Sequence, residues 1–161
     1  MDSTYIKAYK YNGARSMVLL HEKHLKSLLQ SWREAKDKKI NLPKTDDSDY
    51  QSLDTLLRHI LRASRGYMIW ICDKLNLPDP EIEKVPEAEN INREAESYLT
   101  HLLDKWRLPL AEVEEDRFHK PTYISRWGVD YCIDAMLEHV VMHPIRHEFQ
   151  LRNLISNQEI S

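Results

Sequence analysis

Apolar residues recur at three- and four-residue intervals along most of the chain, and strand-like alternation of apolar and polar positions is almost absent. This spacing places apolar side chains on one face of a helix. Glycine occurs only three times, and the seven prolines gather between the periodic segments, where they separate elements. The pattern therefore predicts an all-α protein.

Four periodic segments are long enough to form amphipathic helices. They cover about residues 14–38, 50–75, 88–107 and 129–156. The loop before the second segment offers Asp47 or Ser48 as an N-cap, because short polar side chains accept hydrogen bonds from the first free amides of a helix. The connection over residues 108–127 is longer than an ordinary bundle loop and is expected to be a lid or an interface element. Four such helices predict a four-helix bundle in a single domain spanning residues 1–161.

Charge and composition narrow the class of protein. Lys and Arg number 23 against 26 Asp and Glu, a formal net charge of −3, which gives no electrostatic reason to expect nucleic-acid binding. No apolar run approaches the roughly 18 residues of a membrane span, and the first residues do not resemble a signal peptide. The two cysteines, Cys72 and Cys132, lie far apart in apolar surroundings and are interpreted as reduced thiols. We therefore expect a cytoplasmic protein with no membrane or nucleic-acid partner.

Three histidines follow one another at four-residue steps in the last predicted helix: His139, His143 and His147. At about 100° per residue, with His143 at zero, most apolar residues of this helix fall between about 20° and 80°. His147 lies near 40°, in the middle of that apolar face, and His143 lies at its edge. His139 lies near −40° and should point toward solvent or the margin of a cleft. The three histidines are therefore not equivalent.

Two inward imidazoles one helical turn apart can chelate a single metal ion. An isolated pair of this kind is more often structural than metal-binding, so a third ligand from elsewhere decides the interpretation. His59 in the second helix is the candidate, because it lies at the margin of the apolar face beside the small residues Ala63 and Gly66, which leave room for a ligand. The alternative is a boundary histidine that bonds water. His21 is interpreted as a satisfied core residue, with a fourth-ligand role as the alternative.

The joint placement of these residues resembles the DinB-like family of metalloenzymes, also called DinB/YfiT-like. The matching features are His59 in LRHILRASRGYMIW, and His143, His147 and Gln150 in HPIRHEFQL. The resemblance covers essentially the whole chain in length, helix order and motif placement. It implies a four-helix bundle in which His59, His143 and His147 bind one divalent metal, zinc or nickel, while His139 lies outside the triad.

The resemblance also implies a class of activity. Similar proteins include transferases that use bacillithiol, mycothiol or glutathione, and an isomerase of the same type. We therefore expect a metal-dependent transferase that moves a low-molecular-weight thiol onto small electrophiles, in a chain that forms a homodimer. A metal-dependent hydrolase on the same site is one alternative. A non-catalytic dimeric helical bundle with an opportunistic metal site is another.

Several residues near the predicted triad have open interpretations. Tyr67 and Trp70 lie on the His59 side of the second helix and are candidate pocket-lining residues, although aromatic residues at helical spacing are more often core. Glu138 and Glu148 are candidate general bases by sequence, but neither shares the inward face. Pro144 cannot donate the backbone hydrogen bond to Val140, and it is interpreted either as re-aiming His143 or as a tolerated kink.

Overall fold

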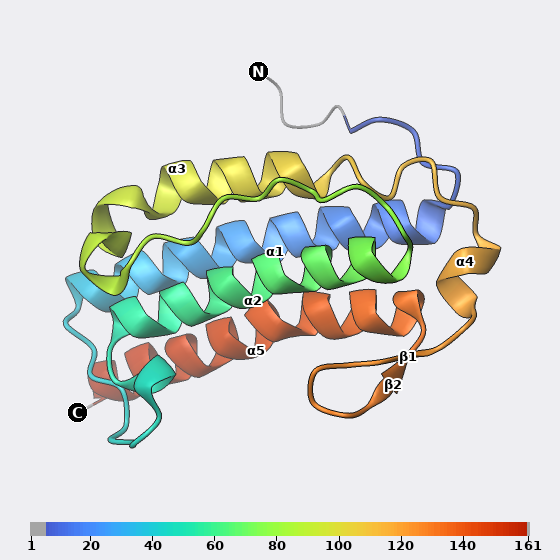
Figure 1. The fold of residues 1–161 in the computed structure, drawn as a ribbon. Helices are drawn as coiled ribbons and strands as arrows, with labels where there is room; N and C mark the ends of the chain where they lie inside the picture. Colours follow the sequence, from blue (N-terminus) through green and yellow to red (C-terminus); the bar gives the residue numbers. More distant parts are fainter. Residues whose placement is uncertain (1–5, 161) are drawn as a thin grey trace.

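Four long helices lie side by side and make up most of the molecule (Figure 1). The computed structural model describes residues 6–160. The long helices are α1 (Asn12–Asp37), α2 (Leu53–Lys74), α3 (Ala88–Trp106) and α5 (Ile133–Ile160). The shorter elements are the 3-10 turn η1 (Ser48–Tyr50), the helix α4 (Asp116–His119), and the strands β1 (Tyr123–Ile124) and β2 (Asp130–Tyr131). The described chain is mostly helical, as the residue spacing predicts.

The start of α2 differs from the prediction. Its N-cap is Ser52, whose hydroxyl accepts a hydrogen bond from the Thr55 amide, while the Thr55 hydroxyl lies 3.0 Å from the Ser52 amide and accepts in return. This reciprocal capping box satisfies two amides at once. The prediction that Asp47 or Ser48 caps α2 is wrong: Asp47 caps η1 by accepting from the Asp49 amide, and Ser48 lies within η1.

The start of α5 also differs from the prediction. Val129, expected on the buried face of the helix, instead follows the turn of a β-hairpin and is 47% exposed. The strands pair Tyr123 with Tyr131 in an antiparallel ladder, and α5 begins only at Ile133. The physical reason is Gly128, whose φ of +82° suits a turn and not a helix. The predicted long connection is therefore a structured one, holding α4 and the hairpin.

An extended segment returns the chain along the outside of α2 before α3 begins (Figure 1). Asn76, with φ of +53°, ends α2 in the left-handed conformation typical of a helix C-terminus. Residues 75–87 can span roughly 40 Å when extended, enough to cover the roughly 33 Å of α2. Ile82 and Val85 bury their side chains along the way. As a result α2 and α3 run in the same direction, while α1 and α5 run opposite to them.

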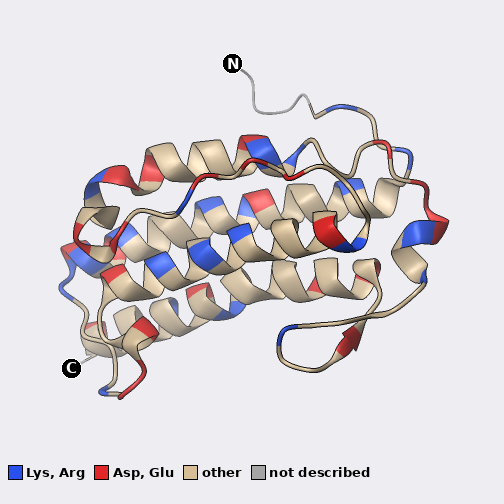
Figure 2. Ribbon diagram, in the orientation of Figure 1, with Lys and Arg blue, Asp and Glu red and all other residues tan. Residues whose placement is uncertain are grey.

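The core fills the space between the long helices, and most charged residues lie outside it, although Glu22 and Glu148 are buried. Figure 2 shows Lys and Arg interspersed with Asp and Glu along every long helix, with no face in this view covered by one sign. The most extensive contact is between α1 and α5, while α2 packs against both α3 and α5. None of the helices in the described part of the chain has the length and apolar character needed to cross a membrane.

His21 on α1 is a buried histidine whose hydrogen bonding is only half complete. Its imidazole stacks on Trp106 with ring centroids 4.0 Å apart, and its Nε2 lies 3.2 Å from the Ser64 hydroxyl. Its Nδ1 has no hydrogen-bond partner. Burial, with a smaller contribution from His24, lowers the pKa of His21 to about 3. The imidazole is therefore neutral wherever the protein is folded at ordinary pH.

Substituting His21 with Gln should remove part of the acid sensitivity of the fold. Below about pH 6.5 the unfolded chain binds a proton at His21, and the folded chain does not until about pH 3, so stability falls as the pH falls through this window. The free energy of unfolding of wild type minus that of His21→Gln should drop by roughly 1.4 kcal/mol per pH unit between pH 6 and 4. Urea unfolding at several pH values measures this difference, and parallel curves for the two proteins would contradict it.

Candidate metal centre

Three imidazoles from two helices meet where α2 lies against α5. His59 on α2, and His143 and His147 on α5, each offer one ligand atom, and these atoms lie within 4.8 Å of one another. His59 Nε2 is 3.2 Å from His143 Nε2. His143 and His147 are buried, and His59 is half-buried. The structure thus brings together the three histidines singled out from the sequence, in a cluster that could hold a metal ion.

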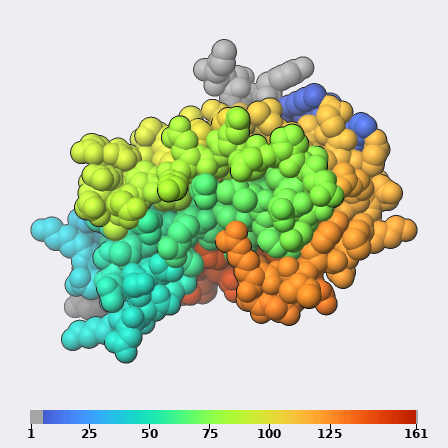
Figure 3. Space-filling model, viewed as in Figure 1, coloured from blue at the N-terminus to red at the C-terminus, as the bar shows by residue number. Residues whose placement is uncertain are grey.

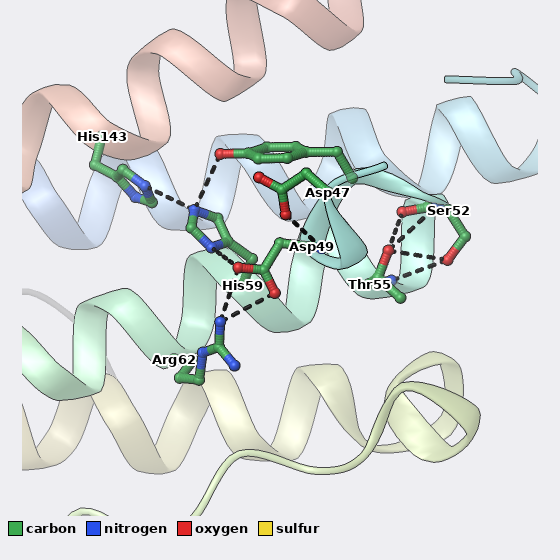
Figure 4. A network of polar contacts seen from close by, with 8 residues as sticks. Asp47, Asp49, Ser52, Thr55, His59, Arg62 and His143 are labelled. Carbon is green, nitrogen blue, oxygen red and sulfur yellow. Dashed lines mark hydrogen bonds and ion pairs between the residues drawn. The ribbon is translucent and has the colours of Figure 1, made fainter. Parts of the chain in front are cut away.

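Two of the three rings have their protons fixed on the nitrogen that faces away from the cluster. His59 Nδ1 donates to Asp49 Oδ2 at 3.0 Å, and His147 Nδ1 donates to Gln150 Oε1 at 3.1 Å. Each Nε2 then carries a lone pair, which is the form of imidazole that binds metals. Figure 4 shows His59 between His143 and Asp49, with Arg62 on the far side of the carboxylate.

Asp49 is a site residue that the sequence analysis missed. Its carboxylate accepts from His59 and also from Arg62, whose Nη2 lies 3.0 and 2.8 Å from the two oxygens. It belongs to η1, so the Asp47 cap that forms this turn also sets the position of the carboxylate. The aspartate-rich run TDDSD just before the second helix was the only available signal, and helical spacing cannot link a turn residue to a helix face.

Burial keeps the two α5 imidazoles neutral. Burial, followed by the nearby His147 and His59, lowers the pKa of His143 to about 3. Burial, followed by His59, lowers the pKa of His147 to about 4, although the hydrogen bond with Gln150 opposes this shift. His143 Nδ1 is buried without a hydrogen-bond partner, so this ring, unlike the other two, has no outer partner to orient it.

Two tyrosines lie close to the cluster. The Tyr50 hydroxyl is 3.4 Å from His59 Nε2, so it points at the same lone pair as His143. Burial, then Asp47, raises the pKa of Tyr50, which favours the neutral hydroxyl as a donor. The Tyr67 hydroxyl lies 3.3 Å from Nε2 of His139, and the rings of Tyr67 and His143 are 6.0 Å apart. His139 is therefore next to the site but outside the triad, half-buried beside the hairpin.

A pocket opens on each side of the cluster. One, the α2–hairpin pocket, has a volume of about 260 Å³ and lies between the α2 face from His59 to Trp70 and hairpin residues Ser125–Trp127. Tyr67 and Trp70 both line it. The other, the α5 groove, has a volume of about 500 Å³ and lies between loop residues 42–50 and the α5 residues His147–Leu154. His59 lines the first and His147 the second, so the histidine cluster can be approached from both.

Glu148 is buried, although the angular argument placed it off the inward face. Its carboxylate accepts hydrogen bonds from Ser27 and Ser31 of α1 and from Arg152. Burial alone would raise the pKa of Glu148, but these hydrogen bonds outweigh burial and lower it. The reason is that α5 packs against α1 as well as α2, so it is buried over a wider arc than a single apolar stripe. Glu148 faces α1, and Glu138 is exposed.

Pro144 lies inside α5 without ending it. The helix is continuous from Ile133 to Ile160, and Pro144 is buried. On either side of it, the rings of His143 and His147 have centroids 4.7 Å apart and planes 81° apart, so the two rings meet edge to face. The interpretation that Pro144 re-aims His143 stays a prediction.

Comparison of the chain with models of known protein families finds no match, and comparisons with curated proteins and with solved structures give no significant match either. The chemistry of the site therefore has to be inferred from its own geometry.

Replacing Asp49 with Asn should weaken divalent-metal binding. The asparagine side chain lacks the negative charge that holds the His59 ring, and it leaves Arg62 without an ion-pair partner. Loss of such an outer partner typically costs 10–100-fold in metal affinity, and we expect a loss of this size for zinc, measured by competition with a chromogenic chelator. Asp47→Asn is the matched control, since Asn can still cap η1. Wild-type affinity in Asp49→Asn would contradict the prediction.

Proposed function

We propose that this chain is a divalent-metal-binding four-helix bundle of the DinB-like kind, and that its three-histidine site transfers a low-molecular-weight thiol onto small electrophiles. One observation carries the proposal. His59, His143 and His147 place ligand atoms within 4.8 Å of one another, and the protons of His59 and His147 are fixed on the outer nitrogens. The homodimer expected from the family resemblance is part of the same proposal.

The distance between His59 Nε2 and His143 Nε2 fits two ligands of one metal ion. Two nitrogens bound to zinc at 2.0–2.1 Å with a tetrahedral angle lie roughly 3.3 Å apart. His59 Nε2 and His143 Nε2 are 3.2 Å apart. Without a metal ion, two neutral rings at this distance form at most one weak hydrogen bond. A cation at this position would take the lone pairs of both nitrogens. The donor set of three neutral imidazoles suits zinc or nickel.

Three protein ligands leave at least one coordination position open, as in catalytic zinc sites. A bound metal supplies Lewis acidity, which lowers the pKa of a thiol and keeps the sulfur as a thiolate. Asp49 and Gln150 orient His59 and His147 toward the shared centre. In the transfer, sulfur forms a bond to the electrophilic carbon, the leaving group departs with the electrons of the broken bond, and the proton of the thiol passes to solvent.

A hydrolase on the same site is the less favoured candidate. A hydrolase needs a general base within reach of the attacking water. Asp49 is the carboxylate nearest the cluster, and it is already bonded to His59 and Arg62. Glu148 faces α1 instead, and Glu138 is exposed. A thiol transferase does not need such a base, because the metal can favour the thiolate directly.

Protein purified without added metal should contain about one divalent metal ion per chain by elemental analysis. His59→Ala, His143→Ala and His147→Ala should each lose roughly 100-fold or more in zinc affinity, since loss of a ligand exceeds the effect of losing an outer partner. Wild type without stoichiometric metal, or His59→Ala that retains as much as wild type, would leave the non-catalytic bundle as the better explanation.

His139→Ala is the matched control for this series, because it removes an imidazole from the same helix one turn before His143. It should keep the zinc affinity of wild type, since His139 bonds Tyr67 and lies outside the cluster. A loss of metal in His139→Ala as large as in His143→Ala would show that general damage to α5, and not ligand loss, explains the series.

A screen of glutathione, bacillithiol and mycothiol with 1-chloro-2,4-dinitrobenzene separates transferase from hydrolase. We expect at least one thiol to give a rate of chloride displacement that zinc or nickel raises and that both a chelator and His59→Ala remove, because the thiolate depends on the metal. The measurement is product absorbance corrected for the uncatalysed reaction. Metal-dependent cleavage of a nitrophenyl ester with no thiol-dependent rate would favour the hydrolase and reject the transferase.

A further inference from the structure

The β-hairpin between α4 and α5 has a well-defined turn that holds the side chains of Arg126 and Trp127 over α2. The Gly128 amide donates to the Ser125 carbonyl at 3.0 Å, and the Ser125 amide donates to the Val129 carbonyl at 2.8 Å. This is a three-residue hairpin loop whose last residue, Gly128, takes the left-handed conformation. Val129 also donates to the Ser125 hydroxyl, which closes the loop further. Arg126 and Trp127 occupy the tip.

Aromatic contacts fix the hairpin against α2. The rings of Tyr67 and Trp127 meet edge to face at 6.4 Å, and those of Trp70 and Tyr123 at 6.1 Å. Trp127 also stacks on His139 at 5.1 Å. Figure 3 shows the orange atoms of the hairpin reaching toward the green atoms of α2, with red atoms of α5 visible in the hollow beside them. The α2–hairpin pocket lies in this region, with aromatic rings on two sides.

The floor of the pocket is a strip of α2 whose middle, at Ala63 and Gly66, lacks large side chains. His59, Ala63, Gly66 and Trp70 follow one another at three- and four-residue steps, so they share one face of the helix. A Cβ placed at Gly66 would meet only the Arg126 guanidinium, 3.6 Å away. The strip between the metal ligand His59 and Gly66 is therefore a shallow trough, roughly 10 Å long, with a cation over its far end.

Arg126 is the cation of the pocket that has no counter-ion among the described residues. Arg62, the other arginine in the lining, bonds both oxygens of Asp49, so the charges of these two side chains neutralise each other. Arg126 makes no hydrogen bond or ion pair within residues 6–160. The pocket therefore carries one uncompensated positive charge, which matches a single carboxylate better than a doubly charged phosphate. A guanidinium also presents two parallel N–H donors to a carboxylate.

We propose that the α2–hairpin pocket binds a small molecule with a carboxylate at one end and a flat apolar body. The carboxylate bonds Arg126, and the body lies on Ala63 and Gly66 beside the rings of Tyr67 and Trp127. The opposite end of the molecule then reaches His59. This rests on the proposed function in one respect, since a thiol at that end would be the group delivered to the metal centre.

The test compares 3-phenylpropanoate with its neutral amide, 3-phenylpropanamide, as probes of the full chain by ligand-observed NMR titration. With metal removed by a chelator, so that no carboxylate can bind a metal, the acid should bind roughly tenfold more tightly than the amide. Arg126→Gln should remove this preference. Arg126→Lys should keep part of it, because lysine retains the positive charge but lacks the two parallel N–H donors of the guanidinium. Arg93→Gln, an exposed arginine outside the pocket, should change nothing.

A second variant tests the apolar body separately from the carboxylate. Gly66→Leu fills the trough while favouring the helix, so it should abolish binding of both acid and amide and leave thermal unfolding no lower than in wild type. Equal binding of acid and amide to wild type, an acid preference that survives Arg126→Gln, or no binding of either probe would overturn the proposal. Because these titrations use metal-free protein, failure of the metal proposal is seen independently, in the zinc measurements.

Discussion

The contact between α2 and α5 at His59 and His143 is the interaction on which the rest of the site depends. Two ring nitrogens 3.2 Å apart across a helix pair require both helices to hold their rotation and register. The returning segment 75–87 lets α2 and α3 run in the same direction, and α2 keeps α5 as a neighbour on its other side. A small slide of either helix would separate His59 from the α5 pair and leave the buried His143 ring without its hydrogen-bond partner.

The turn before α2 links the histidine cluster to the pockets around it. Asp49 and Tyr50 are adjacent in η1, yet the first holds the outer nitrogen of His59 and the second points its hydroxyl at the inner one. Asp49 lines the α2–hairpin pocket and Tyr50 lines the α5 groove. One short turn therefore orients His59 and forms part of the wall of both pockets, so two different molecules could reach the same histidine cluster.

Local pattern predicted much of this arrangement, and its failures have physical causes. Apolar spacing located the four long helices, and the angular positions on the last helix separated His143 and His147 from His139. Glu148 is buried although its angular position lies off the apolar face, because a helix packed on two neighbours has a wide buried arc. The last helix begins at Ile133 and not at Val129, because the left-handed Gly128 makes a hairpin there. The N-cap of α2 is Ser52, which forms a capping box with Thr55, and not the earlier Asp47 or Ser48.

The sequence by itself determined which residues could be ligands, because side-chain chemistry and helical period act over a few residues. It offered an inward HxxxH pair and a marginal histidine some eighty positions earlier. Only the tertiary structure decided that these rings meet, that Asp49 sets the proton of His59, and that Arg126 lies over Gly66. Those facts depend on how whole helices and a hairpin pack against one another, and packing depends on contacts between residues far apart in the chain.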